Sequence, residues 1–455
     1  MTDDDVFLLS DEDAASPEVA ASLTPPPSHD TESSFELLEE AAPIPSEPTP
    51  DDPVTHSFDA AALAQLASEL EPIPEPEPAE SDTAILDPVA RRRADIDAKQ
   101  AIVSRILGEM GCEAVVFLMP AHVAWFTGGM TVRGLIADGE RPGIYTNGSQ
   151  RWLICGNVDS QRLFDEDLDG LGFMLKEWQW GIGRAILLGD LLAGKKVACD
   201  RPFPNMPLIN DKLRRELRPL LTGDRERYQS LGRSVAHALE ATARALRPGD
   251  SEHEAAGQLA HRLYHRGVEV TAMSIAADAR AGRFRRAGFT EVAIERLCNM
   301  QVTATRDGLY ASASRTVCFG PLTPPERSEY DACVRLSAVY RSLSVPNATL
   351  TTVATAANRL TTDTPYEHEW RLSQPGYAAG WFAADELRKA GIDEKFVLHQ
   401  PLIWQTRLGG MAITDTFLVS DAGAVAMTPP DAWPYKLVRL NGQDHVVPDV
   451  LIRIV

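Results

Sequence analysis

The stretch "RDGLYASASRTVCFG" at residues 306–320 joins a turn to a run of small and β-branched side chains. Gly308-Leu309-Tyr310 forms the predicted turn, small residues follow it, and Arg315-Thr316 leads into an apolar run that ends at Gly320. β-rich runs bounded by glycine are typical of strands, so we expect residues 301–320 to form strands around a turn.

Helices are predicted on both sides of these strands. Residues 224–250 form one long helical segment stopped by Pro248-Gly249, and a second segment begins at a capping box, with Ser251 as N-cap and Glu254 three residues later. Another helix is expected at about 324–345, and further strands in the segments "TAMSIAADA", "FVLHQPLIWQTRLGG" and "AITDTFLVSDAG". Residues 223–455 therefore predict an α+β domain of strand ribbons under helices.

Residues 91–222 predict a smaller α/β domain. An amphipathic helix at 91–111 is followed by a buried strand at 112–119, and "GKKVACD" at 194–200 predicts another strand. Between them, "RPGIYTNGSQRWLIC" contains two β-rich runs joined by Asn147-Gly148, a strong hairpin signal. This order indicates a mixed sheet with helices.

Residues 1–90 differ in composition from the rest of the chain. They contain 23 Asp and Glu, no Lys or Arg, no Gly and 14 Pro, a composition that predicts a disordered acidic tail. Two short segments, 34–42 and 58–73, place apolar residues at helical spacing. The tail could bind a protein partner through them, or it could serve only to solubilise the chain.

The charge of the remaining residues is almost balanced. Of the 65 acids, 42 lie beyond residue 90, against 44 Lys and Arg, so we expect no large basic field and no nucleic-acid partner. The acidic N-terminus lacks the features of a signal peptide, and no apolar run is long enough to span a membrane. Six separated cysteines without a CxxC pair indicate reduced thiols and a cytoplasmic protein.

Five segments, in order, resemble motifs of one enzyme family. They are "RPGDSEHEAAGQLAHRLYHRG", "RDGLYASASRTVCFG", "GYAAGW" (376–381), "HQP" (399–401) and "GGMAITDTFLVSDAG" (409–423), of which the last is the most specific. The order resembles the pita-bread metallopeptidases, which include Xaa-Pro aminopeptidases, prolidases and creatinase. The resemblance covers about residues 95–455 and implies a pita-bread C-terminal domain behind a creatinase-like N-terminal α/β domain.

The resemblance also implies where the family's five metal ligands would lie. The two aspartates, the histidine and the two glutamates fall on Gln301, Ser312, Tyr377, Gln400 and Thr414. None of these residues carries a charge, whereas a dinuclear centre of hard cations needs charged oxygen ligands. We therefore expect no metal and no cofactor there. Creatinase works without metal but keeps the histidine and glutamates, which are absent here too.

Other candidate residues each have two interpretations. His399 could join Ser312 and Asp415 in a Ser-His-Asp set, or Asp415 could be purely structural. His261 and His265 suit a metal at spacing i, i+4, or lie on an exposed helix face. The arginine-rich segment 278–286 could bind a carboxylate or a phosphate, or it could be a solvated loop. Arg315 could bind substrate, or it could pair with a nearby carboxylate.

Three functions follow from these patterns. The first is a non-catalytic, aminopeptidase-like protein that binds a peptide, a small molecule or a protein partner, as a homodimer like many relatives. The second is an active aminopeptidase or amide hydrolase with a rearranged site. The third is an adaptor that acts through its acidic tail. Metal content together with peptide turnover distinguishes the first two.

Overall fold

The structure is a computed structural model that describes residues 87–132, 134, 136–372, 374–389, 392–440 and 442–454. The predicted tail at residues 1–90 lies almost entirely outside these ranges, so its predicted disorder and its partner stay predictions. Among the described residues, no helix is long and apolar enough to cross a membrane.

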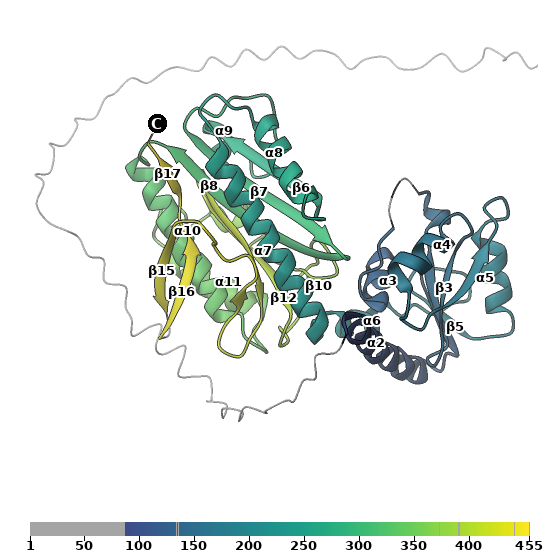
Figure 1. The fold of residues 1–455 in the computed structure, drawn as a ribbon. Coiled ribbons are helices and arrows are strands. Elements are labelled where there is room, and N and C mark those ends of the chain that lie inside the picture. Colours follow the sequence, from purple (N-terminus) through teal and green to yellow (C-terminus); the bar gives the residue numbers. More distant parts are fainter. Residues whose placement is uncertain are drawn as a thin grey trace, which may run out of the picture. The chain divides into compact units, whose positions relative to one another are not determined.

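The first part of the described chain forms a five-stranded mixed sheet in the order β4-β3-β2-β1-β5 (Figure 1). Its strands are β1 (Ala114–Phe117), β2 (Gly143–Thr146), β3 (Arg151–Gly156), β4 (Met174–Trp178) and β5 (Val197–Cys199). Its α-helices are α2 (Pro88–Met110), α3 (Pro120–Thr127), α4 (Ser160–Arg162), α5 (Arg184–Leu192) and α6 (Asn210–Leu217). The parallel pairing of β1 with β5 and the antiparallel pairing of β1 with β2 match the predicted mixed α/β sheet.

The hairpin predicted at Asn147-Gly148 forms, but its connection is longer than a two-residue turn. β2 and β3 are joined by residues 147–150. The Asn147 side-chain oxygen accepts hydrogen bonds from the backbone amides of Ser149 and Gln150, at 3.1 and 2.8 Å. Asparagine therefore shapes this turn through its side chain as well as through its backbone.

The second part is built from two four-stranded sheets, in the orders β17-β8-β7-β6 and β14-β13-β12-β9. Their strands are β6 (Glu269–Ala277), β7 (Leu297–Arg306), β8 (Leu309–Phe319), β9 (Gly376–Ala378), β12 (Pro401–Leu408), β13 (Met411–Leu418), β14 (Val425–Ala426) and β17 (Leu451–Arg453). Two short ribbons pair β10 (Arg388–Lys389) with β11 (Ile392–Asp393), and β15 (Tyr435–Leu440) with β16 (Gln443–Pro448).

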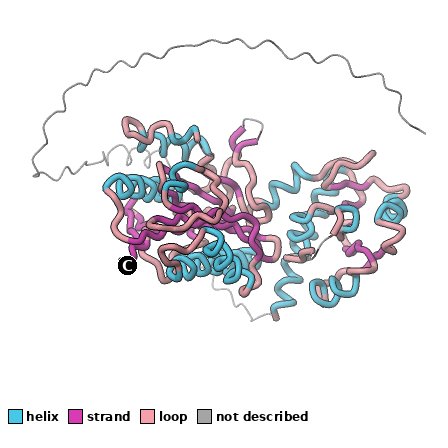
Figure 2. Tube along the Cα trace, turned by 90° about the horizontal axis from the view of Figure 1, so that it is seen from above, coloured by secondary structure: helices cyan, strands magenta, loops and turns pink. Residues whose placement is uncertain are grey.

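Helices cover the outer faces of both sheets (Figures 1 and 2). They are α7 (Thr222–Ala245), α8 (Glu252–Tyr264), α9 (Ala279–Arg283), α10 (Pro324–Leu343) and α11 (Leu350–Thr361). α7 and α8 pack on the β6–β8 sheet, whereas α10 packs on β12 and β13. Figure 2 shows the strands as an inner layer between helices in this part of the chain, the α+β arrangement predicted for it.

Local sequence signals explain where these helices begin and end. α8 starts at the predicted capping box, because the Ser251 hydroxyl accepts the Glu254 amide at 3.1 Å and the Glu254 carboxylate accepts the Ser251 amide at 2.7 Å. α10 has a second capping box between Thr323 and Glu326. The predicted domain boundary at residue 222 falls at the first residue of α7.

The turn of the opening stretch lies slightly earlier than predicted. β7 ends at Arg306 and β8 begins at Leu309, so Asp307 and Gly308 make the turn, with φ values of 54° and 75°. Two positive φ angles are typical of a type I′ hairpin, whose twist matches that of the strands. This turn fixes the pairing of β7 with β8, including Thr303 opposite Ser312.

All six cysteines are buried and unpaired. Burial raises the pKa of the Cys155 and Cys333 thiols to about 12 and also raises that of Cys298, so these thiols stay protonated at neutral pH. We expect the native protein to react slowly with a thiol reagent such as dithionitrobenzoate, and six thiols to react per chain in guanidinium. Rapid labelling of any native thiol would contradict this expectation.

Candidate functional site

A cavity of about 750 Å³ opens between the two sheets of the second part. Its walls come from β6, β7, β8, β9 and β12 and from the segment after α9. The lining includes three of the five predicted pocket residues, Gln301, Ser312 and Tyr377. We call this the central cavity.

Two neutral residues that sequence reasoning missed also line the central cavity. Thr303 lies opposite Ser312 in the hairpin, and the two hydroxyl oxygens are 2.6 Å apart. Gln405 lies on β12, two residues after Ile403, which also lines the cavity. The register set by the Asp307-Gly308 turn and the alternation of side chains along β12 are the signals that could have found them.

The structure does not bring Gln400 and Thr414 to the central cavity. The Gln400 side chain accepts hydrogen bonds from Arg218 and from the Val397 amide, both at 3.0 Å. Thr414 is buried, and its amide donates to the Ser314 hydroxyl at 2.7 Å. The predicted five-residue pocket is therefore only partly assembled: the Gln400 side chain is bound by Arg218 and Val397, and Thr414 is not among the residues that line the cavity.

The Ser-His-Asp set is not assembled either. The Ser312 hydroxyl contacts Thr303, whereas Asp415 accepts from Arg315 at 3.0 Å and from the Thr428 hydroxyl at 2.8 Å. His399 lies elsewhere, with its Nε2 2.7 Å from a guanidinium nitrogen of Arg225. The Asp415 carboxylate is therefore engaged in structural contacts with Arg315 and Thr428 and not with His399.

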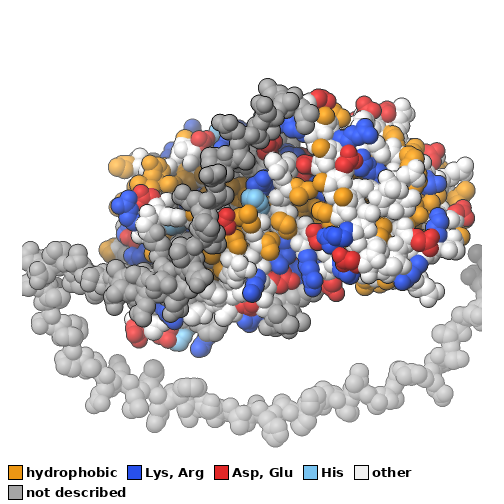
Figure 3. All heavy atoms as spheres, turned by 90° about the horizontal axis from the view of Figure 1, so that it is seen from below, with side chains coloured by type: hydrophobic (Ala, Val, Ile, Leu, Met, Phe, Trp, Pro, Cys, Tyr) orange, Lys and Arg blue, Asp and Glu red, His pale blue; other side chains and the backbone are white. Residues whose placement is uncertain are grey.

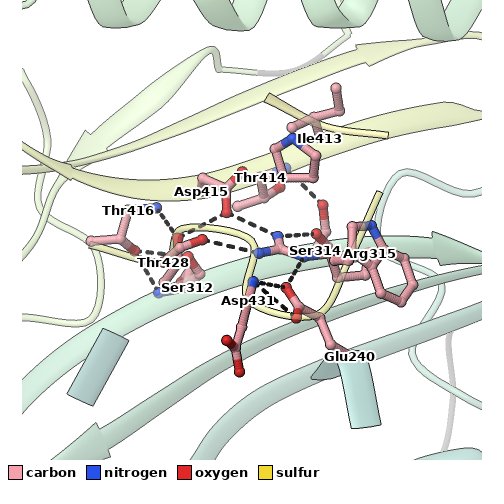
Figure 4. Close-up of polar contacts among 12 residues, drawn as sticks. Glu240, Ser312, Ser314, Arg315, Ile413, Thr414, Asp415, Thr416, Thr428 and Asp431 are labelled. Atoms are coloured by element: carbon pink, nitrogen blue, oxygen red, sulfur yellow. Dashed lines mark hydrogen bonds and ion pairs between the residues drawn. The ribbon is translucent and has the colours of Figure 1, made fainter. Parts of the chain in front are cut away.

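Arg315 is also structural. It is fully buried and donates to Glu240, Asp415 and the backbone oxygens of Ser314 and Thr428, over 2.8–3.0 Å (Figure 4). Glu240 in turn accepts the Asp431 amide. This network joins α7 to β8 and β13 and uses four of the five N–H donors of Arg315. Because its side chain is 0% exposed, Arg315 is out of reach of a substrate.

Hydrogen bonds from nearby hydroxyl groups also connect β8 to β13 (Figure 4). The Thr416 hydroxyl accepts the Ser312 amide at 2.8 Å and donates to the Ser312 carbonyl at 2.7 Å. The backbone of Ser312 is therefore fixed, and the hydroxyl of its side chain is held against Thr303 at the wall of the central cavity.

The residues of the central cavity do not fit the divalent metals of the predicted family site. Gln301, Thr303, Ser312, Tyr377 and Gln405 provide neutral oxygens and amides, and no Asp, Glu, His or Cys is among the described residues that line the cavity. In the described ranges, no group of three such residues is placed to hold a metal. Hard divalent cations need charged oxygen ligands to replace their hydration shell.

The histidine pair on α8 has its own geometry. The rings of His261 and His265 are stacked with centroids 6.3 Å apart, and both residues are exposed. No third ligand joins them within the described part of the chain. The pair fits an exposed helix face.

The lowered pKa of His399 predicts that the free energy of unfolding decreases at acidic pH. Burial and the Arg225 guanidinium lower the pKa of its imidazole, and since a guanidinium can only donate, Nε2 accepts in the neutral form. The unfolded chain takes up a proton near pH 6.5, whereas the folded chain resists it. The contribution of His399 to the free energy of unfolding is therefore fully present above about pH 6.5. It is lost as the pH falls towards the lower pKa of the folded state.

We expect the variant His399→Asn to lose less stability than the native protein between pH 7.5 and 5.5. Asparagine tolerates the left-handed backbone of residue 399, whose φ is 63°. Guanidinium unfolding at several pH values measures the effect, with His265→Asn as the control for loss of one exposed histidine. Burial also lowers the pKa of His445, which is still present in the variant. Part of the dependence of the free energy of unfolding on pH therefore remains. An unchanged slope in His399→Asn would contradict the assignment.

Comparison with known proteins supports the fold. Residues 226–421 match the model of metallopeptidase family M24. This part of the chain is similar to that family. The match begins within α7 and ends beyond β13, so it contains the central cavity and the opening stretch. No curated protein sequence matches the chain.

Solved structures of three peptidases share the fold of both parts. The dipeptidase PepE from Mycobacterium ulcerans is 15% identical, with a TM-score of 0.64 over 80% of this chain and 99% of its own. The prolidase from Pyrococcus horikoshii OT3 is 15% identical, with a TM-score of 0.63 over 74% and 98%. The X-Pro aminopeptidase from Thermotoga maritima MSB8 is 14% identical, with a TM-score of 0.61 over 77% and 100%. The predicted pita-bread fold behind a smaller α/β region is confirmed.

Proposed function

We propose that this protein is a non-catalytic member of the pita-bread family that binds a small molecule or a short peptide in the central cavity. The observation that carries the proposal is that no Asp, Glu, His or Cys is among the described residues that line the cavity, where an M24 enzyme would need charged metal ligands. A pocket of several hundred cubic ångströms with a few polar groups has the size and character of ligand sites.

Unused hydrogen-bonding groups support a binding role. The side chains of Gln301, Tyr377 and Gln405 line the central cavity and make no hydrogen bond with another described side chain or backbone group. Polar groups at a cavity wall that have no internal partner are free to bind water or ligand. A cavity repacked only for stability would satisfy such groups internally.

The test combines metal content with peptide turnover, measured on the whole 455-residue chain. The protein is exposed to Mn²⁺, Co²⁺ and Zn²⁺, desalted and analysed by elemental mass spectrometry, and then incubated with Xaa-Pro peptides. We expect no stoichiometric metal and no hydrolysis, while an active family aminopeptidase treated in parallel retains metal and cleaves the peptides. Two metals per chain together with turnover would overturn the proposal in favour of the hydrolase.

A further inference from the structure

Strand β4 forms one edge of the five-stranded sheet. The strand order ends at β4, whose five residues pair in parallel with β3 and with no other described strand. The pairing is regular, and β4 contains neither the bulge nor the proline with which proteins commonly block a sheet edge. Such an edge presents unpaired amides and carbonyls that a further strand can bind.

The direction of the backbone groups in β4 follows from one hydrogen bond. The Trp178 carbonyl accepts the Asn157 amide, which follows β3, at 2.9 Å, so the backbone groups of Trp178 point towards β3. Backbone groups alternate in direction from one residue of a strand to the next. Those of Lys176 therefore also point towards β3, whereas the amides and carbonyls of Leu175 and Glu177 point outwards.

Exposed apolar side chains accompany this edge. Met174 and Leu175 point to opposite faces of the strand, and both are exposed, Leu175 by 40%. Just beyond the end of β4, Trp180 is 77% exposed. Three further apolar residues in the neighbouring loops and in α5 are more than half exposed, namely Val158, Ile182 and Ile186. Exposed aromatic and aliphatic side chains in one region are typical of a protein–protein contact.

A second copy of β4 fits this edge in one register. In an antiparallel pair centred on a two-fold axis at Leu175, the outward backbone groups of Leu175 and of the partner's Leu175 face each other. Met174 then lies opposite the partner's Lys176. Registers centred on Lys176 or Glu177 would instead place like charges directly opposite each other, which destabilises a strand pair.

We propose that β4 pairs with β4 of a second copy of this chain, antiparallel about a two-fold axis at Leu175, so that the two five-stranded sheets form one continuous sheet. This contact uses the same surface on both copies and therefore closes as a dimer. The inference goes beyond the proposed ligand binding and does not depend on it. It assigns a surface and a register to the homodimer that the sequence predicts.

Cysteine cross-linking of the full chain tests the register. In Leu175→Cys, the two thiols lie in a hydrogen-bonded pair, whose Cα separation of about 5.5 Å suits a disulfide. In the control Glu177→Cys, the two thiols are offset by four residues, about 13 Å along the strands, which a disulfide cannot span. Because the six native cysteines are buried, oxidation with copper phenanthroline acts on the introduced thiol. We expect a disulfide-linked dimer on a non-reducing gel from Leu175→Cys only.

Sedimentation velocity over a wide range of concentration tests the dimer itself. We expect the native chain to sediment as a dimer. Leu175→Arg should raise the dissociation constant roughly tenfold or more, because it places two positive charges opposite each other. Leu208→Arg is the matched control, since Leu208 is 51% exposed and lies beside Cys199 of β5, at the opposite edge of the sheet.

Three outcomes would overturn the inference. They are a native chain that stays monomeric at every concentration, a dimer of unchanged affinity in Leu175→Arg, and equal cross-linking of the two cysteine variants. The second of these would show that the copies meet through another surface. Circular dichroism checks that each variant folds, and the cysteine pair decides the question where Leu175→Arg does not.

Discussion

Replacing Arg315 with alanine is expected to lower the free energy of unfolding by about 3–5 kcal/mol. The guanidinium is fully buried and pairs with Glu240 and Asp415 at 3.0 Å each, so its removal leaves two carboxylates in the interior without their positive partner. The network also links α7 to both sheets, so its loss weakens packing between them. Guanidinium unfolding followed by tryptophan fluorescence and by circular dichroism measures the change.

The matched control is Arg439→Ala. Arg439 pairs with Asp444 at 2.9 Å, but its side chain is 76% exposed, and surface pairs contribute only about 0–1 kcal/mol. A loss of less than about 1 kcal/mol in Arg315→Ala would show that the buried carboxylates find other partners. If the unfolding transitions followed by tryptophan fluorescence and by circular dichroism coincide, unfolding of that variant is two-state.

Replacing Glu252 with alanine should cost a similar amount, about 3–5 kcal/mol. The buried carboxylate accepts from the Ala277 and Thr290 amides and the Thr290 hydroxyl at 2.8 Å, and from Arg280 at 2.9 Å. Alanine leaves these buried donors unsatisfied. The same bonds hold both ends of the segment between Ala277 and Thr290.

Glu291→Ala provides the comparison for this second variant. Glu291 is exposed near Thr290 and pairs with no other described residue, so its removal should change stability by no more than about 0.5 kcal/mol. Equal losses for Glu252→Ala and Glu291→Ala would refute the role of the buried carboxylate. Unfolding is followed as for Arg315→Ala.

The fold could be predicted because its signals are local. The capping box at Ser251 and the stop at Pro248-Gly249 depend on neighbouring residues, and the structure retains them. The order of motifs then identifies the pita-bread arrangement. Asn147 was also predicted correctly as a turn residue, although the length of its loop depends on a side-chain bond.

The site was harder to predict because it depends on register and on distant partners. Gln405 reaches the central cavity and Gln400 does not, since Gln400 is bound by Arg218, which lies far away in the sequence. The roles of Asp415 and His399 were fixed in the same way by Arg315 and Arg225. Motif alignment names positions, whereas tertiary contacts decide which of them face the cavity.

The buried thiols have a practical consequence for spectroscopy. Because all six native cysteines are shielded, a single cysteine introduced at an exposed position can be labelled selectively without first removing them. Residue 283 is suitable, since it lies on the arginine-bearing segment but outside the lining of the central cavity. A fluorophore attached there would report on the environment of the segment while the unmodified cavity is titrated.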